Sequence, residues 1–546
     1  MQEAHVSWLS FGVCLIPIIV FFASLVWFKL QGWLAAAITV FTATVIAIWY
    51  NDITLARSFA LFLEGFLKGM WPIAWIIIAA IFLYKMSEKS GYFAILKHSV
   101  MSITPDHRIQ VIMIAFCFGS FLEGAIGFGG PVAITAALLV GLGLRPLYAA
   151  GLCMIANTAP VVWGAVGIPI IAMAQSVANI SNTDQYLISA MLGRMIVPIT
   201  LFVPFFIVFL MDGIKGVKET FPAIAVATLS FAITQFTSSN FIGAELPDIL
   251  SAIVSLVCTT LFLKVWKPKN IFRVDGLEAE EAEQIPGGKL FLAWMPFLML
   301  VLTVILWQIP AFKALFAAGG ILHYTNVIFT IAPGGNGEIA TKWTLDLVKC
   351  AGTAILLAGI ITAIVMLLKK LIDMKIVWSA AGETLNDMKI PVLTIGLVVA
   401  YASIAAGSGQ AKILGQALAQ TGDAFAFFSP IIGWLGVFLT GSDTSSNLLF
   451  GALQVEAAKV IMAAPGAAVT QGLDTLFLAA NSYGGVVGKM ISPQSIAIAC
   501  AAVGLVGKES DLFRYTVKYS IVFVIFCGIV TWIYAHWLNG WIPLAS

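Results

Sequence analysis

The sequence predicts an all-α polytopic membrane protein with about 12 transmembrane helices and two re-entrant hairpins, arranged as two inverted repeats. The composition, the recurrence of long apolar runs and an internal repeat support this fold class. Of the 546 residues, 60% are hydrophobic and 10% are charged, whereas about 25% of residues are charged in soluble domains. A soluble enzyme, a nucleic-acid-binding protein and a secreted disulfide-linked domain are therefore excluded.

Apolar runs of membrane-spanning length recur along almost the whole chain. A helix of about 20 apolar residues crosses roughly 30 Å of hydrocarbon. Two runs, 148–178 and 473–505, are long enough to cross but contain Asn, Gly and Pro, so we predict broken helices there. The other runs are 8–28, 33–49, 70–86, 186–211, 221–237, 245–264, 290–308, 346–368, 390–406 and 512–536.

Two further segments, 109–143 and 427–462, each consist of two short apolar halves around a polar or glycine-rich centre. Each half has about 13–15 residues, which is short for a complete crossing. We therefore predict that both segments are re-entrant hairpins, which enter and leave the membrane on one side.

Cationic loops orient the chain, because cytoplasmic loops carry an excess of Lys and Arg. With an external N-terminus, twenty Lys and Arg fall inside, seven fall outside and two lie at membrane depth. The outer segment 309–345 is then predicted to be a glycine-rich loop. The predicted divisions are N-terminal scaffold helices (1–63), a first repeat (64–264), a cytoplasmic linker (265–289), connecting scaffold helices (290–382) and a second repeat (383–546).

An internal repeat relates the segments 64–175 and 383–499. Ser90 falls in a predicted cytoplasmic loop and its counterpart Ser408 in an outer loop, so the two copies are predicted to be inverted. Inverted repeats with interrupted helices are typical of secondary transporters, whose substrate site lies where the copies meet. The matched pairs include Ser90-Gly91 with Ser408-Gly409, Phe121-Leu122-x-Gly124 with Phe438-Leu439-x-Gly441, and Ala156-Asn157 with Ala480-Asn481.

Interrupted helices suit an anionic substrate, because a broken helix exposes N–H groups and the positive end of its dipole. Irregular backbone is tolerated at membrane depth only where protein or a polar cavity satisfies it. Glycines used for close helix packing are the alternative interpretation. The predicted substrate-binding residues lie at the hairpin tips and in the broken helices, and they are Gly129, Gly130, Asn157, Ser445, Ser446, Asn447, Asn481 and Lys489.

Four ionisable residues, Glu123, Arg194, Asp443 and Lys489, lie well inside apolar segments. Each costs roughly 2.5–3.5 kcal/mol at mid-helix, so function is the default hypothesis. Lys489 is the cation best placed for a carboxylate, and Glu123 or Asp443 is expected to carry a coupling proton, since burial favours a neutral carboxyl group. Two alternatives stay open. In the first, Lys489 forms an ion pair with Asp443 whose only function is to hold the second repeat together. In the second, Glu123 is a fixed charge partner of Arg194 or caps a helix.

Cysteine and histidine indicate neither a metal site nor a proton relay. The seven Cys stand singly without metal-ligand spacing, which is typical of small buried hydrophobes. The five His all map to loops or helix ends. We therefore expect no metal and no cofactor.

Four stretches of the sequence are long and distinctive. They are Phe121-Leu-Glu-Gly-Ala-Ile-Gly-Phe-Gly-Gly-Pro-Val-Ala-Ile-Thr135, Ile155-Ala-Asn-Thr-Ala-Pro160, Thr440-Gly-Ser-Asp-Thr-Ser-Ser-Asn447 and Ala480-Asn-Ser-Tyr-Gly-Gly-Val-Val-Gly-Lys-Met-Ile-Ser-Pro-Gln-Ser495. They resemble the signature of the bacterial L-lactate permease family, and length and repeat layout extend the resemblance over essentially the whole chain. Gly130 departs from the family pattern, which usually has Thr before the proline, so the preference among 2-hydroxy acids stays open.

The resemblance implies proton symport of L-lactate across the bacterial inner membrane, with D-lactate and glycolate also carried by relatives. It also implies kinship with the ion-transporter superfamily, whose members pair hairpins with broken helices, often work as elevators and are often dimers, so a homodimer is one option. The implied partners are L-lactate and related 2-hydroxy monocarboxylates, protons and the lipid bilayer, and no nucleic acid.

Two other functions compete with this interpretation. A monovalent cation/proton antiporter of the same superfamily would use Asp443 and Glu123 as cation ligands, and Lys489 argues against it. A proton-pumping subunit of a respiratory enzyme would need a chain of Lys, Glu and His along the midplane, which this sequence lacks.

Overall fold

The computed structural model describes residues 7–127, 129–274, 285–317, 319–332, 341–465, 467 and 469–544. Within these ranges, 11 helices are long and apolar enough to cross a membrane, or up to 13 if each of two bent helix pairs counts as one span. The all-α polytopic class is therefore confirmed, and the inverted relation between the two repeats stays a prediction.

The first half of the chain contains two continuous spans that are built from several helical segments, residues 55–89 and 107–125. Its elements are α1 (Trp8–Val26), α2 (Gly32–Trp49), α3 (Leu55–Lys68), η1 (Gly69–Ala74), α4 (Trp75–Lys89), α5 (Tyr92–Met101), α6 (His107–Val111), η2 (Ile112–Phe118), α7 (Gly119–Ala125), α8 (Gly130–Gly141), α9 (Pro146–Ala156), η3 (Val161–Trp163), α10 (Gly164–Val177), α11 (Gln185–Met195), α12 (Val197–Phe241) and α13 (Pro247–Val265).

The second half begins after the linker and adds a small antiparallel sheet to the helices. Its elements are α14 (Gly287–Gln308), α15 (Pro310–Ala314), η4 (His323–Thr325), β1 (Asn326–Ala332), β2 (Thr341–Asp346), α16 (Ala351–Leu368), α17 (Met374–Gly407), α18 (Gln410–Ala419), η5 (Gly422–Ala424), α19 (Phe425–Thr440), α20 (Asp443–Ala463), α21 (Leu473–Gly488), η6 (Lys489–Ile491), α22 (Pro493–Ala502), α23 (Glu509–His536) and η7 (Asn539–Trp541).

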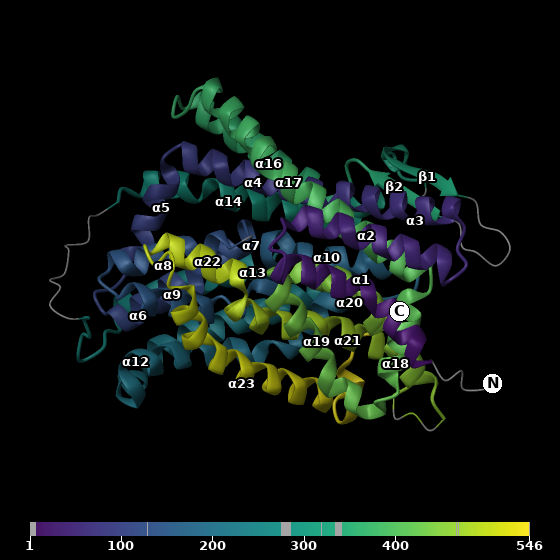
Figure 1. Ribbon diagram of the computed structural model, residues 1–546. Helices are drawn as coiled ribbons and strands as arrows, with labels where there is room; N and C mark the ends of the chain where they lie inside the picture. The colour runs from purple at the N-terminus through teal and green to yellow at the C-terminus, as the bar shows by residue number, and fades with distance from the viewer. Residues whose placement is uncertain are drawn as a thin grey trace.

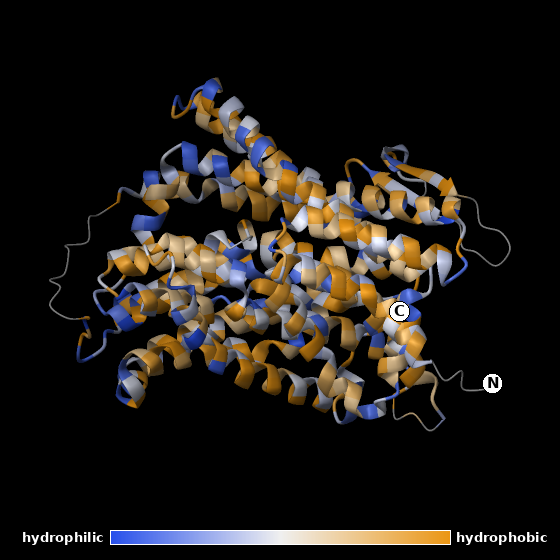
Figure 2. Ribbon diagram, in the orientation of Figure 1, coloured by the Kyte–Doolittle hydropathy of each residue, from blue (hydrophilic) through white to orange (hydrophobic). Residues whose placement is uncertain are grey.

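Most helices lie side by side along one direction, so their ends collect at two opposite ends of the molecule (Figure 1). Apolar residues dominate the helices, and hydrophilic residues concentrate towards these ends (Figure 2). Outward-facing side chains in the middle of helices are apolar and exposed, as for Phe41 (69%), Ile233 (62%) and Val522 (62%). Such a surface suits contact with lipid.

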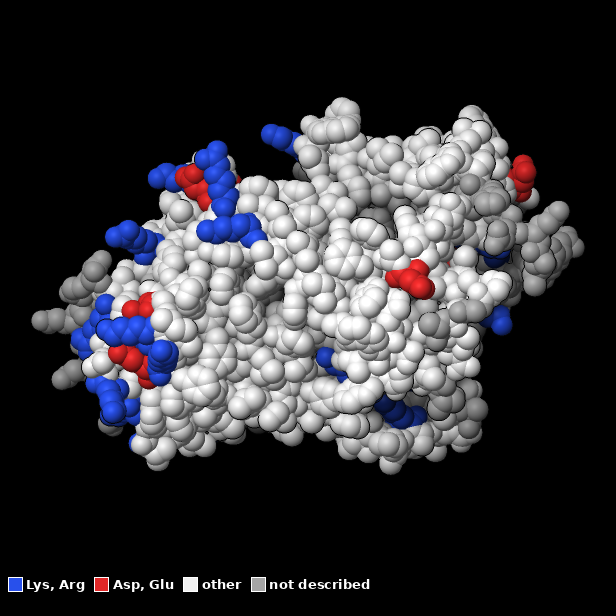
Figure 3. All heavy atoms as spheres, turned by 90° about the horizontal axis from the view of Figure 1, so that it is seen from below, with Lys and Arg blue, Asp and Glu red and all other residues white. Residues whose placement is uncertain are grey.

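Lys and Arg gather at one of these ends on the face shown in Figure 3. It is the end where α5, α6 and the middle of α12 lie, on the left of Figure 1, and β1 and β2 lie at the opposite end. We call these the basic end and the β end. The excess of cationic residues predicts that the basic end faces the cytoplasm.

Two helix pairs turn back on themselves where the hairpins are predicted. The helix α7 ends at Ala125 and α8 begins at Gly130, while α19 ends at Thr440 and α20 begins at Asp443. The helices of each pair pack against each other, and the span 107–125 is entirely buried. We call these two turns the first and second tips.

Two helix pairs are bent where broken helices are predicted. The bend between α9 and α10 is 69°, and the bend between α21–η6 and α22 is 44°. At the first bend, Ala165, Val166 and Gly167 all have positive φ angles, a left-handed conformation that interrupts the helix. At the second, Ser492 is extended (φ −66°, ψ 132°), because a residue before proline is disfavoured in the helical region.

The outer segment 309–345 differs from the sequence prediction. We expected a loop, whereas the structure has α15 and the strands β1 and β2 there. The burial of β1 does not alternate, so the period-two pattern that indicates a strand is absent there. The burial of β2 does alternate over Thr341–Leu345, but this run is short and follows the glycine-rich stretch on which the loop prediction was based.

Some predicted divisions do not coincide with gaps between helices. The boundaries after residues 63 and 382 fall inside α3 and α17. The predicted span 186–211 corresponds to α11 and the first part of α12, and the predicted span 221–237 lies in the second part of α12. The 45-residue α12 is kinked between these two parts, at Asp212 and Gly213. Residues 275–284 of the predicted linker lie outside the described residues.

Candidate functional site

Both tips and both bends meet around a small cavity of about 60 Å³, which we call the central cavity. A water needs about 10–15 Å³ of such space, so the cavity has room for roughly four to six water-sized groups. Its lining comes from the first tip region (Glu123, Gly127, Gly129), the first bend (Val161, Gly164, Ala165, Ile168, Pro169), the second tip (Gly441, Ser442, Asp443, Thr444) and the second bend (Lys489, Gln494, Ser495, Ile498).

The helices α8, α10, α20 and α22 all begin at the central cavity. The first turn of a helix has N–H groups without intrahelical partners, and it carries the positive end of the dipole. Each such end favours an anion by about 0.3–1 kcal/mol. A cavity surrounded by helix N-termini is therefore suited to a small anion.

Glu123 and Lys489 form an ion pair across the central cavity. Lys489 Nζ lies 2.7 Å from Glu123 Oε1, and both residues are more than nine-tenths buried. Asn157 Nδ2 donates to Glu123 Oε2 at 3.2 Å. Removing one partner of such a buried pair costs about 3–5 kcal/mol, because the other charge stays buried without compensation. The pair therefore holds the first tip against the second bend.

Asp443 is held by neutral groups of its own half. Its Oδ2 accepts hydrogen bonds from the Ser482 hydroxyl and from Asn447 Nδ2, the latter at 3.2 Å. Its Oδ1 has no hydrogen-bond partner among the described residues. Asn447 Oδ1 in turn accepts from Asn481 Nδ2 at 2.9 Å, and Asn447 Nδ2 lies 3.2 Å from the carbonyl oxygen of Pro169. This network joins the second tip to α21 and to the first bend.

Two glycines allow the carboxylates to reach the cavity. A Cβ at Gly164 would lie 2.8 Å from Glu123 Oε1, and a Cβ at Gly485 would collide with Asp443 Oδ1. A side chain at either position would displace the carboxylate, so the site requires glycine at both positions.

Asp248 is a buried carboxyl group that the sequence prediction did not include. It lies in the first turn of α13 and is 1% exposed. It packs against the end of α7, because a Cβ at Gly124 would be 2.8 Å from its Cβ. Neither carboxyl oxygen has a hydrogen-bond partner among the described residues. Burying an unpaired carboxylate is costly, so we expect Asp248 to be protonated.

Some of the predicted substrate-binding residues line the central cavity, and others lie in a second layer behind its lining. Gly129 and Lys489 line the central cavity, whereas the side chains of Asn157, Asn447 and Asn481 bond to Glu123, Asp443 or each other behind the lining.

Three other predicted residues, Gly130, Ser445 and Ser446, lie next to the tips but are not among the residues that line the central cavity. Ser445 N donates to Ser442 Oγ at 3.2 Å, so Ser442 caps α20 and Ser445 lies in its first turn. Ser446 Oγ donates to the carbonyl of Gly433 at 3.1 Å, which fixes α20 on α19. Gly130 is the first residue of α8.

Arg194 does not lie where we expected a charge partner. Its Nε donates to Asn240 Oδ1 at 2.9 Å and its Nη1 to the carbonyl of Trp541. No carboxylate lies within 4 Å of it in the described part of the chain. The cation beside Glu123 is Lys489, so the pairings of Glu123 with Arg194 and of Lys489 with Asp443 are both corrected.

Several residues in and around the cavity carried only a weak signal in the sequence. Ser482, Gln494 and Ser495 belong to the distinctive run 480–495 but are neutral, so the rule that singles out charges in apolar segments passes over them. Asp248 follows Pro247 at the start of a predicted span, where an acidic residue is typical of an ordinary helix N-terminus. Only the packing shows that this N-terminus is buried.

The polytopic helical fold and its charged internal cavity define a multi-pass membrane transport protein, and its family and relatives locate it in the bacterial inner membrane. The chain belongs to the L-lactate permease family, whose sequence profile matches residues 10–538. It is 50% identical to the L-lactate permease of Escherichia coli K12 over 554 aligned residues, which cover 98% of each chain. It is 48% identical to the glycolate permease of the same organism, over 97% of each chain. The solved YdaH transporter of Alcanivorax borkumensis aligns over 89% of each chain, with a TM-score of 0.48 and 12% identity.

Proposed function

We propose that this protein is a secondary active transporter that takes up L-lactate, and D-lactate or glycolate, by symport with protons. Family membership and the relatives named L-lactate permease and glycolate permease support the substrate class. An elevator-type movement is part of the proposal, with the two tips and the two bends moving together around the bound substrate.

The observation that carries the proposal is the central cavity, where helix N-termini and Lys489 face a space of about 60 Å³. L-lactate has about six non-hydrogen atoms, which this space can hold. The substrate carboxylate would lie at Lys489 and the helix N-termini. Its hydroxyl group would bond to one of the predicted Asn or Ser side chains behind the present lining, which are Asn157, Asn447, Asn481, Ser445 and Ser446.

Competition for Lys489 supplies a mechanism of proton coupling. In the structure, the ammonium group is engaged by Glu123. A substrate carboxylate that takes this ammonium leaves Glu123 buried without a cation, at a cost of about 3–5 kcal/mol if it stays ionised. Protonation of Glu123 removes that cost. Binding of the monoanion therefore draws in one proton, and release of either ligand favours release of the other.

Asp443 is the alternative proton site, because its Oδ1 has no hydrogen-bond partner among the described residues while its Oδ2 accepts from Ser482 and Asn447. With Asp248 the region holds more carboxyl groups than the ammonium of Lys489 can balance. At least some of them must be neutral, since unbalanced charges in a dry site are strongly unfavourable.

The test is uptake of labelled L-lactate into liposomes that contain the purified protein, with an acidic exterior. We expect accumulation that follows the pH gradient and responds little to membrane potential, because a proton and a monoanion together carry no net charge. D-lactate and glycolate should compete, and pyruvate should compete less because it lacks the hydroxyl group.

Failure to accumulate L-lactate under a pH gradient would contradict the symport proposal. A proton flux that follows a Na⁺ or K⁺ gradient without any monocarboxylate would support the cation/proton antiporter instead. Liposomes without protein give the passive entry of lactic acid, which must be subtracted.

A further inference from the structure

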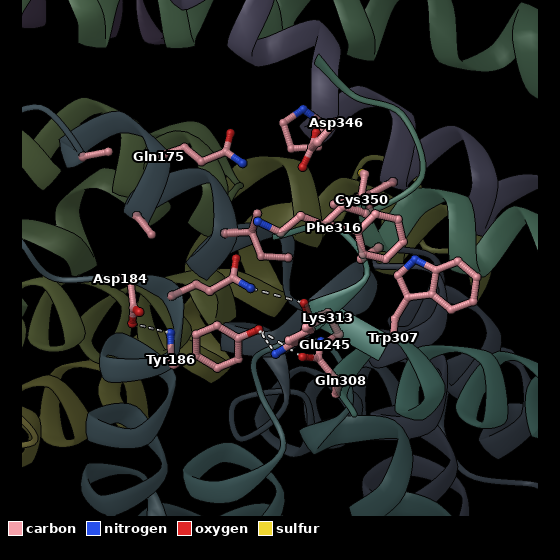
Figure 4. A pocket seen from close by; sticks show the side chains of 18 of the residues that line it. Gln175, Asp184, Tyr186, Glu245, Trp307, Gln308, Lys313, Phe316, Asp346 and Cys350 are labelled. Atoms are coloured by element: carbon pink, nitrogen blue, oxygen red, sulfur yellow. Dashed lines mark hydrogen bonds between the residues drawn. The ribbon is translucent and has the colours of Figure 1, made fainter. Parts of the chain in front are cut away.

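A second cavity, of about 560 Å³, lies towards the β end of the molecule, and we call it the outer cavity. Figure 4 shows its polar side chains, with Tyr186, Glu245 and Gln308 grouped around Lys313. It is much larger than the central cavity, and it is lined by polar and charged groups together with Trp307 and Phe316. Its walls come from α10, from the connection between α10 and α11, and from the chain between α14 and α16.

The outer cavity lies close to the central cavity along α10. Ile168 lines the central cavity and Ile171 lines the outer one. Three residues of an α-helix rise by about 4.5 Å, so less than one helical turn separates the two cavities along this wall. Asn447 Nδ2 contacts the carbonyl of Pro169 within the same turn, at 3.2 Å. The partition between the cavities is therefore thin and contains the side chain of Asn447 from α20.

The outer cavity lies at the end of the molecule that the charge distribution predicts to be external. β2 ends at Asp346, which lines the cavity. The β end lies opposite to the basic end (Figure 1), where Lys and Arg gather on the face shown in Figure 3. A solute that arrives from outside would meet the outer cavity before the central one.

Lys313 is a cation of the outer cavity whose ammonium group is hydrogen-bonded to a neutral hydroxyl. Its Nζ donates to the Tyr186 hydroxyl at 2.7 Å, and the Tyr186 hydroxyl donates to Gln308 Oε1 at 2.9 Å. No carboxylate oxygen lies within 4 Å of Lys313 or Lys349 in the described part of the chain. Burial lowers the pKa of Lys313, and the nearby carboxyl group of Glu245 opposes this effect only in part.

Three carboxyl groups, Asp184, Glu245 and Asp346, line the outer cavity, and Asp184 accepts from the N–H groups of Tyr186 and Leu187 at the start of α11. Burial raises the pKa of Glu245 and the pKa of Asp346, so both favour the neutral form more than an exposed carboxyl group does. Glu245 Oε2 and Gln175 Oε1 are buried and have no hydrogen-bond partner among the described residues. These groups can hold a small polar ligand that also meets Lys313.

We propose that the outer cavity is an access vestibule that binds a small monocarboxylate anion at Lys313 before the anion passes along α10 to the central cavity. The inference rests on the proposed transport function and adds a second binding site to it. The vestibule would raise the local concentration of the anion on the external side, and the turn of α10 between Ile168 and Ile171 would form the barrier to the central cavity.

The charge is tested by Lys313→Gln, with Lys342→Gln as the matched control. Lys342 lies on β2, is exposed and does not line the outer cavity. We expect Lys313→Gln to raise the KM for external L-lactate about fivefold at low ionic strength, with a smaller fall in the maximal rate. The difference from the unsubstituted protein should shrink at 0.5 M salt, because screening weakens long-range attraction. A KM equal to that of the control would overturn the proposal.

The position is tested by Ala178→Cys and a membrane-impermeant thiol reagent. Ala178 lines the outer cavity and is exposed. We expect labelling from the outside, and we expect L-lactate to slow it. Ala94→Cys, at an exposed position of α5 at the basic end, is the control and should be labelled only from the inside. The unsubstituted protein gives the background from its own cysteines, including Cys350 of the outer cavity.

The outcomes separate the two proposals. Absence of L-lactate uptake by the unsubstituted protein would contradict the transport function. Normal uptake together with labelling of Ala178→Cys that L-lactate does not slow would contradict the vestibule and leave the transport function standing.

Discussion

The two carboxylates of the central cavity occupy related segments of the chain but have different partners. Glu123, at the first tip, is paired with the ammonium of Lys489 from the opposite half. Asp443, at the second tip, is bonded by a hydroxyl and an amide from its own half, Ser482 and Asn447. A substrate anion that binds Lys489 therefore removes the partner of Glu123. It leaves the partners of Asp443 in place and affects Asp443 only by lying near it.

This difference separates two functions that similar side chains can perform. A carboxylate whose counter-ion is also the substrate's binding group senses substrate binding, because the two anions compete. A carboxyl group held by neutral donors keeps its partners when substrate arrives, and it contributes mainly shape and hydrogen bonds. We therefore expect Glu123 to couple substrate to protons and Asp443 to support the geometry of the second tip.

Removal of the shared cation should have the largest effect on this comparison. Lys489→Met deprives both Glu123 and the substrate of their cation, and a loss of about 3–5 kcal/mol corresponds to at least a hundredfold fall in uptake. The thermal midpoint of the purified protein should also fall. The double variant Lys489→Met with Glu123→Gln should regain thermal stability but not uptake. Uptake by the single variant near the wild-type level would remove Lys489 from the substrate site.

Neutralising Glu123 should separate binding from coupling. In Glu123→Gln the amide cannot take up a proton, so we expect accumulation driven by the pH gradient to fall about a hundredfold. Exchange of internal for external L-lactate at equal pH should continue, because Lys489 is then free to bind the carboxylate. Accumulation that still follows the pH gradient would show that Glu123 is not the proton carrier.

The corresponding change at the second tip should be milder. Asp443→Asn retains the size of the side chain but weakens the bonds from Ser482 and Asn447, which are worth about 1.5–3 kcal/mol when the acceptor is charged and less when it is neutral. We expect roughly a tenfold loss of uptake, with dependence on the pH gradient retained. The reverse pattern, with coupling lost here and kept in Glu123→Gln, would assign the proton to Asp443.

The smallest effect is expected at Asp248. We expect its carboxyl group to be neutral already, so Asp248→Asn replaces one neutral group by another of the same shape, and uptake should change by no more than about twofold. The variant is assayed in the same liposomes as Glu123→Gln. A loss of gradient-driven accumulation here would mean that the proton resides on Asp248 and reaches Glu123 from it.

The sequence was sufficient to predict the fold class and to single out three charged residues that line the central cavity, but not how these charges pair. Glu123, Asp443 and Lys489 stand out because ionisable groups are rare in apolar helices. Their pairing depends on the three-dimensional approach of segments far apart in the chain, and electrostatics alone permits either acid beside Lys489. Arg194 was singled out for the same reason, yet it is bonded to an amide and a backbone carbonyl and not to a carboxylate. Asp248 was missed because its burial is a property of packing.

The ion pair across the cavity also has a consequence for the synthesis of the chain. Glu123 and Lys489 are 366 positions apart. Ribosomes add about 5–20 residues per second, so the acid enters the membrane roughly 20 to 70 s before its partner exists. During that interval a neutral, protonated Glu123 is the form that the lipid tolerates best. The site is thus completed late. In a chain that stalls before Lys489, the first tip lacks the second bend against which it packs.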